Sequence, residues 1–105
     1  MSKKSRKTLR KELRDCIFAN LKKRGMSDTV HTDRAEEYLS LWDIREDLRE
    51  DIKANGTTQF DEKRGMTVEN RSVSLMIQTS RQMTALYQLL GLVDMEKTES
   101  VDDDL

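Results

Sequence analysis

The sequence contains no proline, one cysteine and one histidine, and each scarcity removes a class of protein. Because Cys16 is alone, it cannot form a disulfide within the chain, which argues against a secreted domain held by disulfides and favours a reducing cytoplasm. His31 has no cysteine or second histidine clustered near it, so we expect no metal site. The missing proline, with abundant Leu, Arg, Lys, Glu and Met, favours a helical protein.

Long apolar runs are also absent from the sequence. No stretch approaches the roughly 20 residues of a membrane-spanning helix, and no apolar core follows the basic N-terminus as in a signal peptide. Gly-rich phosphate loops, Cys-x-x-Cys pairs and Gly-x-Ser-x-Gly turns are missing as well. We therefore expect a soluble cytoplasmic protein that needs no membrane and no cofactor and is not an enzyme.

Charge is segregated along the chain, although the formal net charge of the 105 residues is only -1. The first 24 residues are strongly basic and residues 93–105 are strongly acidic, as end segments that bind partners or stay solvated commonly are. In the first segment only Glu12 and Asp15 oppose the cations. In the last segment only Lys97 opposes the acids, which are Asp94, Glu96, Glu99, Asp102, Asp103 and Asp104.

A first helix is predicted over residues 5–24, where Leu9, Leu13, Cys16, Ile17 and Leu21 follow helical spacing and Gly25 offers a terminator that lets Met26 cover Leu21. The opposite side of this helix carries cations around Phe18, an arrangement able to follow a phosphate backbone. The same side could instead dock on an acidic helix. The candidate DNA-binding residues are Lys4, Lys7, Lys11, Arg14, Lys22, Lys23 and Arg24.

A second helix is predicted from Thr32 or Asp33, with Asp33 and Glu36 at capping-box spacing, to Asn55 before Gly56; residues 25–31, with His31, form a linker. Its seam for helix pairing is Tyr38, Leu41, Arg45, Leu48 and Ile52, with Arg45 as the one polar interruption, and Ala35, Leu39 and Trp42 widen the apolar surface at the N-terminal end. The remaining face holds Glu36, Asp43, Asp47, Glu50 and Asp51. Their repulsion suggests nearby cations, for which the first helix of a neighbouring copy is one source, although a solvated face is the simpler interpretation of most of these carboxylates.

A change to period 2 follows, with Thr58 and Phe60 before a polar loop at residues 61–65 and Met66 and Val68 after it. This pattern predicts a small β-hairpin. Two strands alone are only marginally stable, so the hairpin should pack on the helices through Phe60, Met66 and Val68 or pair across a subunit boundary.

A third helix is predicted to begin after Asn70, a favoured N-cap, and to end at Gly91, with Leu92 folding back on Tyr87. It has two apolar sides and therefore needs two partners, the second helix and a neighbouring copy. One side comprises Val73, Met76, Ile77, Ser80, Met83, Thr84, Tyr87 and Leu90, and the other, assigned to the neighbouring copy, comprises Leu75, Leu86 and Leu89. The candidate oligomerisation residues are Tyr38, Leu41, Trp42, Leu48, Leu75, Leu86 and Leu89.

The predicted fold is therefore mainly α, with two long antiparallel helices joined by a β-hairpin. We expect three segments: a basic helix at 1–25, an oligomerisation core at 32–92 and a disordered acidic tail at 93–105. The tail ends in Asp102, Asp103, Asp104 and Leu105, which could dock on a basic partner, although a solubilising tail is the simpler reading.

Three stretches carry a family resemblance: GMTVEN at residues 65–70, SLMI at 74–77 and LLGL at 89–92. With the preceding long helix and Gly56, residues 38–92 resemble bacteriophage terminase small subunits. Many members carry proline after the asparagine, where this chain has Arg71; proline there only presets the first helical turn, so the departure costs little.

The resemblance implies a non-catalytic, DNA-recognising subunit of the viral genome-packaging motor. It also implies a homo-oligomeric ring, viral double-stranded DNA and the large terminase subunit as partners, and the host cytoplasm as location. The basic first segment would then bind DNA, the long helices would build the ring, and the acidic tail would engage the large subunit.

Two alternatives remain open from the residues alone. One is a helical adaptor in which the first helix pairs with the acidic face of the second and no nucleic acid is bound. The other is a small DNA-binding regulator with a helix-turn-helix near Gly25. The long acidic second helix disfavours the regulator, because a recognition helix is normally short and reads bases with basic and polar side chains.

Overall fold

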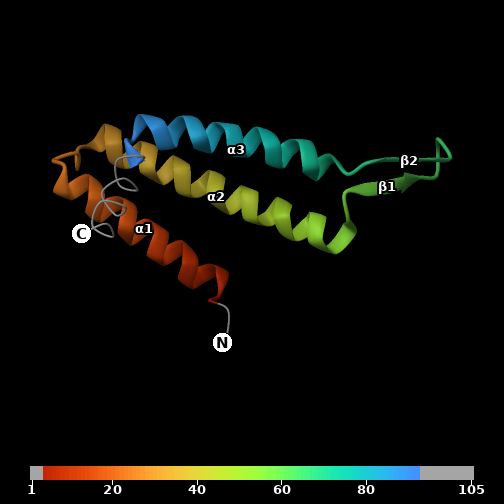
Figure 1. Cartoon of the computed structure of the whole chain (residues 1–105), viewed down its shortest axis with the longest axis horizontal. Coiled ribbons are helices and arrows are strands. Elements are labelled where there is room, and N and C mark those ends of the chain that lie inside the picture. The colour runs from red at the N-terminus through yellow and green to blue at the C-terminus, as the bar shows by residue number, and fades with distance from the viewer. Residues whose placement is uncertain (1–3, 93–105) are drawn as a thin grey trace, which may run out of the picture. The chain divides into compact units, whose positions relative to one another are not determined.

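The computed structural model describes residues 4–92 of the chain. The elements are α1 (Arg6–Lys23), α2 (Thr29–Asn55), β1 (Thr58–Asp61), β2 (Met66–Glu69) and α3 (Arg71–Leu89), shown in Figure 1. The mainly helical class and the hairpin between two long helices are as predicted. The acidic tail predicted at 93–105 lies outside the described residues.

Local side-chain and glycine signals set both ends of α1. Ser5 is the N-cap, and its Oγ accepts a hydrogen bond from the backbone N–H of Thr8 at 3.2 Å. At the other end Gly25 has φ +72°, and the N–H of Met26 donates to the carbonyl oxygen of Leu21 at 2.7 Å. This is the left-handed helix ending that the Gly25 and Met26 pattern predicted.

Helix α2 begins at Thr29, three or four residues before the predicted start at Thr32 or Asp33. Its cap is Asp28: Oδ2 of Asp28 accepts a 3.4 Å hydrogen bond from the N–H of His31, and the Asp28 carbonyl accepts one from the N–H of Thr32 at 3.0 Å. The prediction that Asp33 and Glu36 form the capping box, with His31 in a linker, is therefore wrong. Asp28 supplies the same capping chemistry one turn earlier. The predicted end at Asn55 is confirmed.

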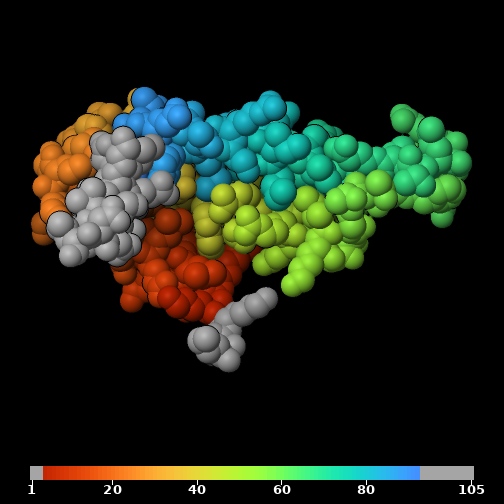
Figure 2. All heavy atoms as spheres, viewed as in Figure 1, coloured from red at the N-terminus to blue at the C-terminus, as the bar shows by residue number. Residues whose placement is uncertain are grey.

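The hairpin pairs β1 with β2 in antiparallel register, with Phe60 opposite Thr67 and Asp61 opposite Met66. Opposed residues share a face, so Phe60 and Met66 lie on opposite faces of the two-stranded ribbon. Their exposed fractions are 66% and 53%, and the hairpin stands out from the helix ends in Figure 2. The expectation that Phe60 and Met66 pack on the helices is therefore wrong, because the ribbon extends past the end of the helix pair.

The described residues form two compact units, one of residues 4–39 with 85–92 and one of residues 40–84. In the first unit Ile17 and Leu21 of α1 form a buried cluster with α2 and with the end of α3. The other members of this cluster are Ala35, Leu39, Leu90 and Leu92, with Tyr38 and Tyr87 packed against it. Burial of these side chains supplies the main favourable free energy for docking α1.

The most deeply buried line of α2 differs from the predicted seam. Ala35, Leu39 and Trp42 have exposed fractions of 0%, 0% and 7%. The seam residues from Tyr38 to Ile52 are all half-buried instead. Over residues 35–42 the buried face is therefore rotated by about 100° from the predicted seam, onto the residues that were predicted only to widen it, and no residue of α2 after Trp42 is buried.

Candidate nucleic-acid interface and assembly surfaces

Three lysines form an exposed basic stripe on α1. Lys7, Lys11 and Lys22 are separated by four and eleven residues, which places them within about 60° of one another around the helix axis. The stripe lies beside the helix face that Ile17 and Leu21 bury. Lys23 is also exposed but lies about 100° further round the helix. A row of solvent-exposed ammonium groups along one helix can contact successive phosphates.

Arg14 lies at the border between the basic stripe and the buried face. Its Nη1 pairs with Oε1 of Glu36 on α2, and its guanidinium lies 4.6 Å from the centroid of the Phe18 ring. The side chains of Arg14 and Glu36 are 44% and 47% exposed. The cation expected beside this acidic residue therefore comes from the α1 of the same chain.

Lys4, also of the predicted set, forms an ion pair as well. Its Nζ lies 3.0 Å from Oε1 of Glu12, two helical turns along α1, and both side chains are more than half exposed. An exposed pair of this kind contributes little to stability, so the lysine can exchange its carboxylate for another anion at small cost.

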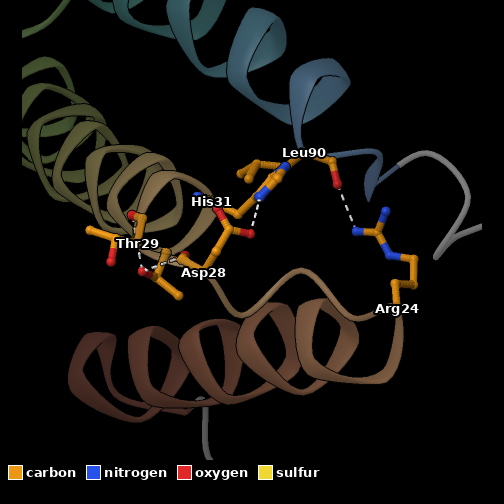
Figure 3. A network of polar contacts seen from close by, with 6 residues as sticks. Arg24, Asp28, Thr29, His31 and Leu90 are labelled. Carbon is orange, nitrogen blue, oxygen red and sulfur yellow. Dashed lines mark hydrogen bonds and ion pairs between the residues drawn. The ribbon is translucent and has the colours of Figure 1, made fainter.

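Arg24 is hydrogen-bonded to the end of α3, as Figure 3 shows. Its Nε donates to Oδ1 of Asn20 at 2.7 Å, and its Nη2 donates to the carbonyl oxygen of Leu90 at 2.6 Å. The guanidinium is part-buried and joins the end of α1 to the end of α3. Because these two hydrogen bonds hold the guanidinium against the ends of α1 and α3, we place Arg24 outside the candidate nucleic-acid face.

The predicted oligomerisation residues divide into buried and exposed members. Trp42 and Leu86 are each 7% exposed, so their side chains are covered within one copy. Leu89 is 60% exposed, while Tyr38, Leu41, Leu48 and Leu75 are half-buried. The Tyr38 ring also lies 6.5 Å from the Tyr87 ring, between centroids. Trp42 and Leu86 therefore support the fold of the single chain, and the half-buried and exposed members offer surface.

The side of α3 predicted to face α2 is partly open. Ile77 on that side is 48% exposed, whereas Met83 and Leu90 are buried at 3% and 0%. A hollow of about 380 Å³ lies there, lined by Met76, Ile77, Ser80, Arg81 and Thr84. The buried line of α3 instead follows Thr79, Met83, Leu86 and Leu90, so the predicted division of the helix into two sides is wrong for Ile77 and for Leu86.

A polar cluster of Asp51, Asn55, Asn70 and Ser72 lies at the start of α3, and the sequence pattern did not predict it. The amide oxygen of Asn70 accepts from the N–H of Ser72 at 3.0 Å, which confirms the predicted N-cap. Its Nδ2 donates to Oδ2 of Asp51 at 3.0 Å and to the Gly56 carbonyl at 2.9 Å, and Ser72 Oγ donates to the same Asp51 oxygen at 2.6 Å. Asn55 Nδ2 donates to Oδ1 of Asp51 at 2.8 Å. The i, i+4 spacing of Asp51 and Asn55 was visible beforehand, but the partners from α3 were not.

These hydrogen bonds, that from Ser72 first and then those from Asn70 and Asn55, hold the pKa of Asp51 below its ordinary range. The pKa of Asp28 is lowered in the same way, chiefly by the hydrogen bond with the His31 side chain, whose Nδ1 lies 2.5 Å from Oδ1 of Asp28 (Figure 3). Both carboxylates thus serve the first turns of helices, α3 and α2 respectively.

Comparison with known proteins now bears on these surfaces. Residues 11–99 match the family described as phage terminase, small subunit. The chain belongs to this family. The match spans all of α2, the hairpin and α3, together with most of α1, and so extends beyond the residues 38–92 that carried the resemblance. No curated protein and no solved structure shows significant similarity to the chain.

Membership of the terminase small-subunit family assigns the chain a role in phage genome packaging, in which the family is generally a non-catalytic component. The family also implies involvement with DNA and with the large terminase subunit. Within residues 4–92 no three His, Cys, Asp or Glu side chains are grouped so as to hold a metal ion. No helix of the described part has the length and apolar character to cross a membrane.

Proposed function

We propose that the chain is the DNA-recognition component of the packaging motor, that it assembles as a homo-oligomeric ring, and that it delivers viral double-stranded DNA to the large terminase subunit. The observation that carries the DNA assignment is the stripe of Lys7, Lys11 and Lys22, three exposed ammonium groups on one side of a docked helix. In a ring this stripe repeats in every copy, so weak contacts add through multivalency.

Salt titration tests the DNA contact. If roughly five phosphates are neutralised, log affinity for duplex DNA should fall with log salt at a slope near -4 to -5. Replacing Lys7, Lys11 and Lys22 together by Gln should make the slope shallower by about 0.9 for each lost contact. A matched control replaces Lys53, Lys63 and Arg64, which are also exposed, by Gln. Loss of binding in the control with normal binding in the α1 variant would move the DNA contact to the hairpin.

The adaptor alternative is favoured by one observation. It requires α1 to pair with the acidic face of α2, and the Arg14 contact with Glu36 is such a pair. It leaves Lys7, Lys11 and Lys22 exposed, however, and so leaves the stripe available for a phosphate backbone. An adaptor would show no salt-dependent affinity for duplex DNA, so the same titration separates the two functions.

The role of residues 93–105 rests on their sequence alone, since they lie outside the described residues. We propose that Asp102, Asp103, Asp104 and Leu105 engage the large subunit. Deleting residues 99–105 should preserve assembly and DNA binding while reducing co-purification with the large subunit. Loss of assembly in the deletion variant would reject this role, because a partner-binding segment is dispensable for the ring.

A further inference from the structure

One side of α3 carries a shallow, open apolar hollow formed by the side chains of this helix alone. Met76, Ile77, Ser80 and Thr84 line it, Arg81 borders it, and Ile77 remains 48% exposed. Helix α3 has no acidic residue, and its charged side chains are Arg71 and Arg81. Arg71 lies on the other side of the helix, so the surface is apolar with one positive charge, Arg81, at its edge. This composition suits a helix with apolar anchors and an acidic neighbour.

The outer side of α2 has the complementary character. Ile44 is 47% exposed, and the half-buried Leu41 and Leu48 flank it at three residues before and four after. This i, i+3, i+7 spacing puts the three side chains in one line, as in helices that dock in grooves. Asp47, which is exposed, and Asp51 lie on the Ile44 side of this line. Arg45 lies on its other side, where its side chain is only 26% exposed and pairs with Glu46.

Charge decides between the possible pairings of these two surfaces. Contact of α3 with α3 in a second copy would bring Arg81 near its own equivalent, and contact of α2 with α2 would bring acidic helices together. Like charges at an interface cost several kcal/mol in general, whereas opposite potentials favour association. The pairing of α2 with α3 instead brings Asp47, three residues after Ile44, toward Arg81, four residues after Ile77, and covers both exposed isoleucines.

We propose that Ile44, with Leu41 and Leu48, occupies the α3 hollow of a neighbouring copy. This proposal deepens the proposed ring assembly and rests on it. Because the two surfaces differ, the contact is heterologous: each copy uses its α2 line on one neighbour and its α3 hollow on the other. Such a contact propagates until rotation closes it into a ring. The proposed contact keeps Leu41 and Leu48 as assembly residues. On α3 it assigns this role to Ile77, because Leu86 is buried within the chain.

The test uses two variants of the full chain, Ile44→Asp and Ile77→Asp, each of which places a carboxylate in the apolar contact. Native mass spectrometry and sedimentation should show at least about a tenfold rise in the protein concentration needed for assembly, the loss typical of a disrupted hot spot. Both positions are about half exposed, so circular dichroism should retain the helical signal. Gln82→Asp, on the opposite side of α3, adds the same charge to this helix and should assemble normally.

Mixing the two variants gives the sharper result. Each retains one intact surface, so the mixture should form a 1:1 dimer that cannot grow, while each variant alone stays monomeric. If Ile77→Asp alone disrupted assembly and Ile44→Asp did not, a two-fold α3 contact would replace the proposal. Assembly of both variants at wild-type mass, with loss of large-subunit binding in Ile77→Asp, would make the hollow a site for that partner instead.

A third variant tests the charge contribution at an exposed position, where the substitution leaves the fold intact. Arg81→Glu keeps the apolar hollow but reverses the charge at its edge, and should raise the assembly concentration in a salt-dependent way. Unchanged assembly of Arg81→Glu at low salt would overturn the charge argument. A wild-type chain that is monomeric at all concentrations would overturn the ring itself, whereas a wild-type ring unaffected by all three substitutions would overturn only the contact proposed here.

Discussion

Nη2 of Arg24 donates a 2.6 Å hydrogen bond to the carbonyl oxygen of Leu90, 66 residues further along the chain. The bond connects the end of α1 to the end of α3, next to Gly91. Gly91 has φ +70°, and a Cβ added there would lie 2.6 Å from Nη1 of Arg24. Helix termination and the docking of the basic helix therefore depend on the same few atoms.

Gly91→Ala should lower the free energy of unfolding by about 1–3 kcal/mol, because the left-handed conformation is strained for alanine and the new methyl group displaces Arg24. Urea denaturation at fixed protein concentration measures the loss. Gly25→Ala is the control, since Gly25 has φ +72° and open space around its Cβ position. An equal loss in both variants would show that the close approach of Arg24 contributes nothing.

Arg24→Gln and Lys22→Gln remove one positive charge each from the same end of α1, but with opposite expected results. Arg24→Gln should cost about 1–3 kcal/mol of stability, because hydrogen bonds from a charged donor to Asn20 and Leu90 are lost, and should leave the salt slope of DNA binding unchanged. Lys22→Gln should leave urea unfolding unchanged and make the slope shallower by about 0.9. A shallower slope in Arg24→Gln would return this residue to the nucleic-acid face.

Glu36→Gln should raise DNA affinity about two- to fivefold at low salt. In the wild type, Arg14 must break its ion pair with Glu36 before it can bind a phosphate, and an exposed ion pair of this kind is worth about 0.2–1 kcal/mol. Fluorescence anisotropy with labelled duplex DNA measures the change. Glu37→Gln is the matched control, being an exposed neighbour with the same change of charge. An equal rise in DNA affinity in the two variants would mean that only the change in net charge matters, and would contradict a specific role for Arg14.

Stability should depend on pH through Asp51, whose pKa is lowered in the folded chain by hydrogen bonds from Ser72, Asn70 and Asn55. A lowered folded-state pKa means that the contribution is complete above the ordinary Asp pKa of about 3.9 and is lost as the pH falls below it. Thermal unfolding of Asp51→Asn and wild type between pH 7 and pH 3 tests this. The difference in midpoint should shrink on acidification; a difference independent of pH would contradict the carboxylate's role.

Short-range signals made much of the fold predictable. Ser5, Asn70, Gly25, Gly56 and Gly91 act on backbone groups within a few residues, so their effect on helix ends can be read locally. The hairpin was equally predictable from its alternation and polar loop. The start of α2 was missed because Asp28 and Asp33 both offer capping chemistry, and the sequence alone does not distinguish them.

The basic stripe of the candidate site was predictable, since Lys7, Lys11 and Lys22 follow helical spacing on an exposed side. The separate setting of Arg24 was not, because its acceptor belongs to α3. The burial of Leu86 and the exposure of Ile77 were likewise not predictable: Leu86 was predicted to face a neighbouring copy and Ile77 to face α2. Both are aliphatic residues of one helix, and which of them is covered depends on the direction from which the partner helix approaches.

The amino-acid sequence by itself determined the helical class, the helix ends set by glycine and asparagine, the hairpin, the segregated charge and the family, because each rests on local periodicity, caps or motifs. Only the tertiary structure decided that Ala35, Leu39 and Trp42 are the buried line of α2, that Asp51 receives hydrogen bonds from Asn70 and Ser72, and that Ile77 remains open. These depend on rotation about helix axes, where a shift of one residue turns a face by about 100°.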